Sequence, residues 1–86
     1  MPTISRFFGI TIYMFHRDHV PPHIHAWKGG SRSVFTIKDG RRTEGKLSKG
    51  DEKLVAAWIE IHRRELLEDW KLARAKKNLF EIDPLG

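Results

Sequence analysis

Four of the five histidines of this chain lie in one short stretch, HRDHVPPHIH, which spans residues 16–25. His23 and His25 are two residues apart, so on a strand both imidazoles leave the same face, with Cα atoms about 6.5 to 7 Å apart. At that spacing one metal ion or one phosphate group could contact both rings. Because histidine exchanges protons near neutral pH, His23 and His25 are also candidate acid–base catalysts, with His19 as a third.

A metal site is one chemistry that this stretch allows. His62 and Glu65 are three residues apart and share a face of a predicted helix. If that helix crosses the strand, the two pairs supply three histidines and one carboxylate as ligands. The ordinary alternative is that His62, between Trp58 and Leu66 on an apolar stripe, packs in the core. Our first interpretation therefore assigns no metal and no cofactor.

A nucleic-acid site is the other chemistry, because cations that could hold a phosphate backbone follow the histidines. They are Lys28, Arg32, Arg41 and Arg42. Sixteen Lys and Arg against eleven Asp and Glu give a formal net charge of +5, which favours a polyanion or an acidic protein as partner. Gly29 and Gly30 could present free backbone N–H groups to a phosphate. The ordinary alternative is a solvated hairpin loop at KGGSR.

These residues allow three classes of function. A metal-independent ribonuclease would use His23 or His25 as base and acid, with Arg32 or Lys28 stabilising the charge on the phosphorane. A non-enzymatic module would bind a protein partner or DNA, and its histidines would be structural. A histidine-ligated metal protein is the third class. Metal analysis and incubation with RNA, with and without chelator, would separate them.

The histidines need a scaffold, and the pattern predicts an α+β fold whose first part is a small antiparallel sheet. About four to five strands are expected over residues 3–47, with Gly9 at a turn and Pro21 and Pro22 at a strand entry. Asp39-Gly40 predicts a two-residue hairpin turn before the last strand. Trp27 shares a strand face with His23 and His25, so it either forms the floor of their site or packs under the helical part.

The second part of the fold is helical: one bent helix or two helices over residues 49–76, packed on one face of the sheet. Ser48 is the predicted N-cap, with Asp51 in the position of a capping-box acid. One stripe recurs at spacings of three and four: Leu54, Val55, Trp58, Ile61, His62, Leu66, Trp70 and Ala73. A straight helix from Lys49 to Lys76 would be about 42 Å long, so we expect a break near residues 62–65.

The sheet and the helical stripe together predict one hydrophobic core. Its expected members are Ile10, Ile12, Phe35, Ile37, Leu54, Trp58, Leu66 and Trp70. The last segment, LFEIDPLG, is expected to be a tail or an edge strand that stops at Pro84.

The length of 86 residues predicts a single domain over residues 1–86, because a chain of this size buries one core. The absence of cysteine excludes disulfides and thiolate metal sites and fits a reducing cytoplasm. The opening MPTISRFFGITIYMF lacks the features of an export signal, and no apolar run approaches the roughly 18 residues of a membrane span. We therefore expect a cytoplasmic protein without a membrane partner.

Three segments carry a family resemblance: MPTISRFFGI at the start, DHVPPHIHA in the middle, and LVAAWIEIHRRELLEDWKLA in the helix. Their order and spacing resemble a small bacterial family catalogued as domain of unknown function 4160. The resemblance implies a cytoplasmic bacterial protein that is the toxin half of a toxin–antitoxin pair, with a small antitoxin-like protein encoded nearby as its partner. Together with the charge and the histidines, it predicts a toxin-like component that acts on RNA or the translation machinery.

Overall fold

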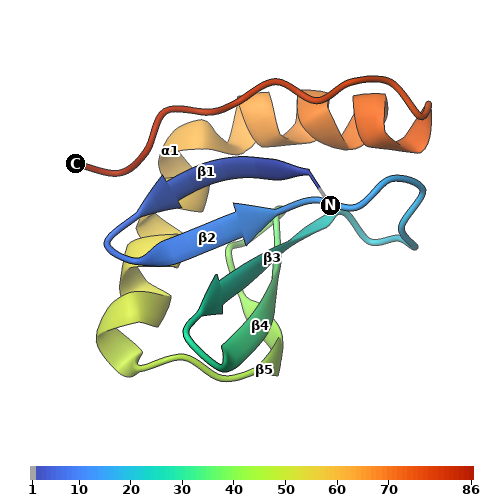
Figure 1. The fold of residues 1–86 in the computed structure, drawn as a ribbon. Coiled ribbons are helices and arrows are strands. Elements are labelled where there is room, and N and C mark those ends of the chain that lie inside the picture. Colours follow the sequence, from blue (N-terminus) through green and yellow to red (C-terminus); the bar gives the residue numbers. More distant parts are fainter. Residues whose placement is uncertain (1) are drawn as a thin grey trace.

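The computed structural model describes residues 2–86 and consists of a five-stranded antiparallel sheet followed by one long helix (Figure 1). The strands lie in the sheet in their chain order: β1 (Thr3–Phe7), β2 (Ile10–Tyr13), β3 (His23–Lys28), β4 (Ser31–Thr36) and β5 (Arg42–Gly45). The helix, α1, covers Lys49–Arg74. The predicted α+β fold is confirmed. Within the described part of the chain, no helix is long and apolar enough to span a membrane.

The turns of the sheet differ in one place from the prediction. β3 and β4 are joined by the two-residue turn Gly29-Gly30. The predicted two-residue turn at Asp39-Gly40 is wrong, because residues 37–41 all lie between β4 and β5. Ile37 is fully buried in the core, and the Thr36 N–H donates to the Arg41 carbonyl at 2.9 Å, so the strands separate before Asp39 is reached.

The start of α1 has the predicted N-cap, Ser48, but Glu52 rather than Asp51 accepts a hydrogen bond from the preceding backbone. The Ser48 side chain accepts a hydrogen bond from the Asp51 N–H at 3.1 Å, as an N-cap does. The acid that accepts from the preceding backbone is Glu52, which takes the N–H of Leu47 at 3.2 Å. Asp51 instead pairs with Lys28 at the end of β3, at 3.1 Å. The helix start is thereby tied to the sheet.

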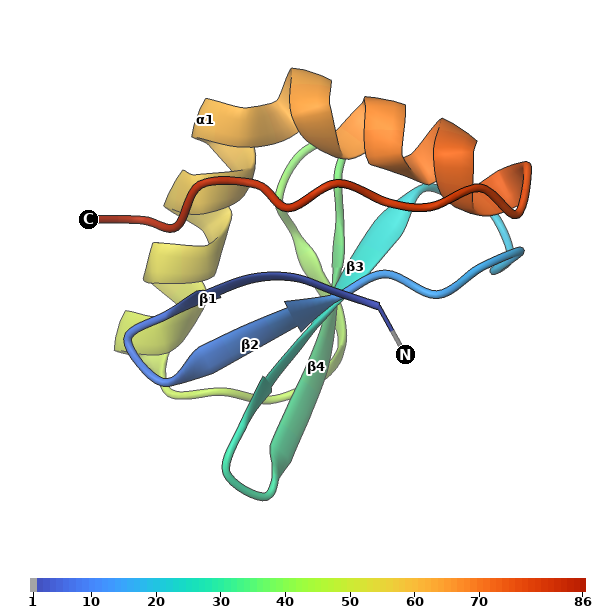
Figure 2. The same cartoon turned by 45° about the horizontal axis from the view of Figure 1, so that its top comes forward.

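The predicted break in the helix lies at His62, whose φ of −108° and ψ of 20° are non-helical. Figure 2 shows the two halves of α1 meeting at an angle, so each half follows the curved sheet. Ile61, expected in the buried stripe, is 64% exposed, and Ile59 is buried in its place. The physical reason is rotation: Ile61 is six residues, about 600° of turn, beyond Val55 and faces away from it.

The core lies between one face of the sheet and α1. Seven of the eight predicted core residues are buried: Ile10, Ile12, Phe35, Ile37, Trp58, Leu66 and Trp70. Leu54 is the exception, because it is only partly buried at the margin of this cluster. The core also contains residues that the pattern did not select, such as Met14 and Ile24.

The C-terminal segment runs back along α1 toward β1 (Figures 1 and 2). It is not a strand, but the Ile82 N–H donates to the Ile4 carbonyl at 2.8 Å. Its residue Asp83 accepts the indole N–H of Trp58 at 2.8 Å, and Ile82 is 3% exposed. The tail thus closes the core along β1. On the opposite face of the sheet, Tyr13, His25 and Trp27 remain partly exposed among the described residues.

Candidate functional site

The face of the sheet that points away from the core carries aromatic side chains. Along β3, Ile24 and Ala26 are fully buried, whereas His25 and Trp27 alternate with them and are half-buried. The ring centroid of Trp27 lies 4.4 Å from the ring centroid of Tyr13 on β2. The guanidinium of Arg32, on β4, lies 4.1 Å from the Trp27 ring centroid. Trp27 therefore belongs to the open face of the sheet and does not pack under α1.

Two adjoining hollows form a groove on this open face, which we call the open-face groove. The first is lined by Phe15, His25, Trp27, Arg32, Ser33, Val34, Glu44 and Gly45. The second is lined by His19, Pro21, His23, Val34, Thr36, Thr43 and Glu44. Because both include Val34 and Glu44, the hollows are neighbours, and the aromatic end of the groove leads to the histidines.

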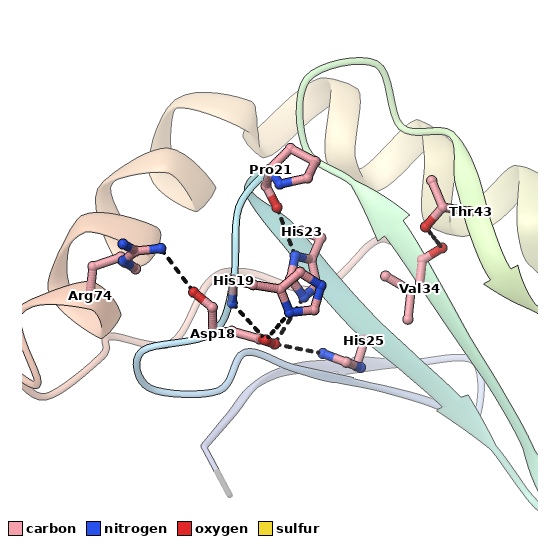
Figure 3. Close-up of polar contacts among 8 residues, drawn as sticks. All are labelled: Asp18, His19, Pro21, His23, His25, Val34, Thr43 and Arg74. Atoms are coloured by element: carbon pink, nitrogen blue, oxygen red, sulfur yellow. Dashed lines mark hydrogen bonds and ion pairs between the residues drawn. The ribbon is translucent and has the colours of Figure 1, made fainter.

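Asp18 is the centre of the histidine cluster (Figure 3). Its Oδ2 atom lies 2.9 Å from Nε2 of His23 and 3.2 Å from Nε2 of His25. Its Oδ1 atom accepts the backbone N–H of His19 at 2.9 Å and lies 3.0 Å from Nδ1 of the same residue. One carboxylate thus contacts the three histidines that the sequence singled out as candidate catalysts.

His23 is the most enclosed member of the cluster, with 4% of its surface exposed. Its Nδ1 donates to the carbonyl of Pro21 at 2.7 Å, and its ring lies 5.2 Å from that of Trp70 on α1. The Pro-Pro loop therefore has a structural purpose, because it turns the Pro21 carbonyl toward His23 at the entry to β3. The ring is fixed on both of its nitrogen atoms.

The loop that carries Asp18 is held by the C-terminal end of α1. The Arg17 N–H donates to the Ala73 carbonyl at 3.1 Å. The Arg74 guanidinium donates to the Asp18 carbonyl at 2.9 Å (Figure 3). The Ala73 carbonyl also accepts the Lys76 N–H at 3.1 Å, so this carbonyl at the end of α1 joins the loop to the helix C-terminus. The second half of α1 thereby sets the position of the Asp18 side chain.

The electrostatics of the cluster favour an ionised Asp18 beside a neutral His25 ring. Burial alone would raise the pKa of Asp18, but hydrogen bonds from His25, the His19 backbone and His23 outweigh it and lower that pKa to about 2. Burial lowers the pKa of His25, and the hydrogen bond to Asp18 offsets only part of this effect. Near neutral pH, His25 can therefore offer a lone pair.

The two remaining histidines, His16 and His62, make their contacts outside this cluster. His16 contacts the carbonyl of Lys77 through Nε2 at 3.0 Å. His62 lies at the break of α1, where its Nδ1 is 2.6 Å from Glu65 and its ring is 5.6 Å from Trp58. The carboxylate that joins His23 and His25 is therefore that of Asp18 and not that of Glu65.

Asp18 is a member of the cluster that was not among the site residues predicted from the sequence. It precedes His23 by five residues and His25 by seven, with the two prolines between them. A carboxylate close before an H-x-H strand was the available signal. The three side chains place one ligand atom each within 4.8 Å of one another, so they could hold a metal ion.

The four predicted phosphate-binding cations have separate environments. Arg32 lines the open-face groove. Lys28 pairs with Asp51, and Arg42 pairs with Glu52 at 2.8 Å, so both connect the sheet to the start of α1. Arg41 is exposed in the loop before β5. Arg32 is therefore the one of these four that shares a hollow with a histidine of the pair, His25.

Comparison with known proteins gives one match. The family model described as domain of unknown function (DUF4160) matches residues 9–71, which include β2 to β5, most of α1, the open-face groove and the histidine cluster. No curated protein and no solved structure matches the chain significantly. Since the family model covers well over half of the sequence, this chain belongs to the DUF4160 family.

Proposed function

We propose that this protein is a toxin-like component of a bacterial toxin–antitoxin module and that it binds single-stranded RNA in the open-face groove. The observation that carries the RNA proposal is the arrangement of Tyr13, Trp27 and Arg32 on an uncovered sheet face. Exposed aromatic rings on a sheet are platforms on which unpaired bases stack, and arginine adds a cation beside them. The toxin expectation rests on the family resemblance.

The composition of the groove also supports RNA as the ligand. Arg32 is exposed and can meet a phosphate while its guanidinium lies over the Trp27 ring. The net charge of +5 favours association with a polyanion. Glu44, which lines both hollows, adds a negative charge to the groove. A carboxylate repels phosphate but accepts hydrogen bonds from the amino groups of bases, so the groove suits bases better than backbone.

The histidine cluster lies at one end of the bound strand in this proposal. Because the Nε2 atoms of His23 and His25 both face Asp18, the pair does not present two free nitrogens to one phosphate. His19 differs, since its side chain is 76% exposed. The cytoplasm is the compartment that the proposal requires, because RNA and the antitoxin partner are both found there.

The direct test is the affinity for a labelled single-stranded RNA of about 12 nucleotides, measured by fluorescence anisotropy. Trp27→Ala should weaken binding about 5- to 100-fold, which corresponds to the loss of one stacked base. Arg32→Gln should weaken it and reduce its dependence on salt. A duplex of the same sequence should bind less tightly, because its bases are not available for stacking.

Arg64→Gln is the matched control, because Arg64 is exposed on α1 and its substitution removes the same charge. It should leave the affinity within about twofold of wild type if the groove is the site. Circular dichroism would establish that each variant is folded. Equal losses in the Arg32 and Arg64 variants would mean non-specific attraction to a basic protein, and unchanged binding by Trp27→Ala would refute the stacking site.

A further inference from the structure

We infer that Asp18, His23 and His25 form a binding site for one divalent transition-metal ion. The site differs from the metal set that the sequence suggested, because its carboxylate comes from the loop before β3. Two imidazoles and one carboxylate are donors that suit zinc, iron(II), cobalt(II) and nickel(II). Magnesium and calcium prefer oxygen ligands, so a site with two nitrogen donors selects against them.

The spacing of the donor atoms is the spacing found around a metal ion. Oδ2 of Asp18 lies 2.9 Å from Nε2 of His23 and 3.2 Å from Nε2 of His25. Two ligand atoms that each lie about 2.1 Å from one ion, at tetrahedral or octahedral angles, are roughly 3.0 to 3.4 Å apart. The ligand atoms of the three side chains all lie within 4.8 Å of one another, so one ion could contact all three once the two rings adjust around it.

The hydrogen bond of His23 to the backbone is the second observation. A carbonyl only accepts hydrogen bonds, so Nδ1 of His23 carries the proton that it donates to Pro21. In the neutral ring Nε2 then carries a lone pair, and that lone pair faces a carboxylate oxygen. Two acceptors at 2.9 Å require a cation between them, either a proton or a metal ion.

The same hydrogen bond favours the metal ion over the proton. Histidine ligands of metal sites usually donate their other N–H to a backbone carbonyl or a carboxylate, which fixes the tautomer and the ring orientation. Without a metal ion, His25 could donate to Asp18 from Nε2 as a neutral ring, but His23, whose Nδ1 proton already bonds to Pro21, could donate from Nε2 only as an almost fully buried imidazolium cation. One metal ion satisfies both rings with neutral imidazoles.

The proposed ion would keep free coordination positions. Three protein ligands leave room for water or for a ligand atom, which is the arrangement of catalytic rather than structural zinc sites. His23 lines one hollow of the open-face groove and His25 lines the other, so two of the three proposed ligands border that groove. If the proposed RNA binding is correct, a phosphate of the bound strand would be the group that reaches them.

The experiment uses the full chain expressed without a histidine tag and stripped with chelator. Isothermal titration with zinc should show one ion per chain, and zinc should raise the Tm because it binds the folded state. Titration with cobalt(II) should give the visible absorption bands of a bound ion. Asp18→Asn and His25→Gln should each weaken zinc binding by at least about tenfold.

His16→Gln is the matched control, because it removes a histidine of the same stretch that lies outside the cluster. Its zinc affinity and stoichiometry should equal those of wild type. Absence of stoichiometric zinc binding by wild type, or an equal loss in all three variants, would overturn the metal site. RNA is not needed in this titration, and Trp27→Ala should bind zinc normally, so failure of the metal site and failure of the RNA site are separate results.

Discussion

Asp69 is a carboxylic acid in the interior of the protein, under the C-terminal tail. It is fully buried, its Oδ1 accepts the N–H of Phe80 at 3.0 Å, and its Oδ2 has no hydrogen-bond partner among the described residues. Burial raises its pKa to about 6, and the hydrogen bond from Phe80 offsets only part of this effect. The folded protein therefore binds this proton more tightly than the unfolded chain.

This raised pKa predicts the pH dependence of stability. Protonated Asp69 contributes to the free energy of unfolding, and this contribution is complete below the unfolded pKa of 3.8. It is lost as the pH rises through the folded pKa of about 6. A shift of about two units corresponds to about 3 kcal/mol. Asp69→Asn, which can still accept from Phe80, should match wild type near pH 4 and be more stable near pH 8. Urea unfolding at both pH values would measure this, and a difference that does not vary with pH would contradict it.

Trp58 is the residue whose removal should cost most in the core. Its side chain is fully buried, contacts Phe7 with ring centroids 5.3 Å apart, and donates its indole N–H to Asp83. Trp58→Ala should therefore lower the free energy of unfolding by about 3 to 5 kcal/mol. Denaturant unfolding would measure the loss, and a value below about 1 kcal/mol would show that this core is wrongly assigned.

At the scale of elements, Gly45 permits the close approach of β5 to β4. Its φ is +73°, and a Cβ atom there would overlap the carbonyl of Arg32. Gly45→Ala should therefore destabilise the protein by more than about 1 kcal/mol, beyond the cost of the positive φ alone. Gly50→Ala is the control, because nothing lies within 4 Å of a Cβ atom at that position of α1. Thermal unfolding would compare them, and equal Tm values would contradict the proposed packing.

The elements were largely predictable, because alternation and helical spacing depend on neighbouring residues. The helix break was predictable for a different reason: an unbroken α1 would exceed the size of the sheet. The longer loop over residues 37–41 was not predictable, because the burial of Ile37 outweighs the local preference of Asp39-Gly40 for a two-residue turn. Asp18 was also missed as a site residue, since its position depends on Arg74, 56 residues away. The histidine pair was predictable from two-residue spacing alone.

At the scale of the whole molecule, the charge distribution bears on the proposed antitoxin partner. Lys28 and Arg42 pair with acids at the start of α1, whereas Arg32 and Arg41 are exposed and make no side-chain ion pair among residues 2–86. We propose that a small acidic protein encoded nearby binds this region and displaces RNA. Co-purification with that protein should weaken as salt is raised. Recovery of no neighbour-encoded protein at low salt would count against the partner.

The central claim is that the uncovered face of the sheet is the functional surface, and the most direct measurement is an NMR titration of the nitrogen-15-labelled protein with single-stranded RNA. The three tryptophan indole N–H groups give a built-in comparison. The signals of Trp27 and of the Arg32 backbone should shift as RNA is added, while the Trp58 indole, held by Asp83 inside the core, should not. Shifts confined to the outer face of α1, or no shift of the Trp27 indole at saturating RNA, would contradict the account.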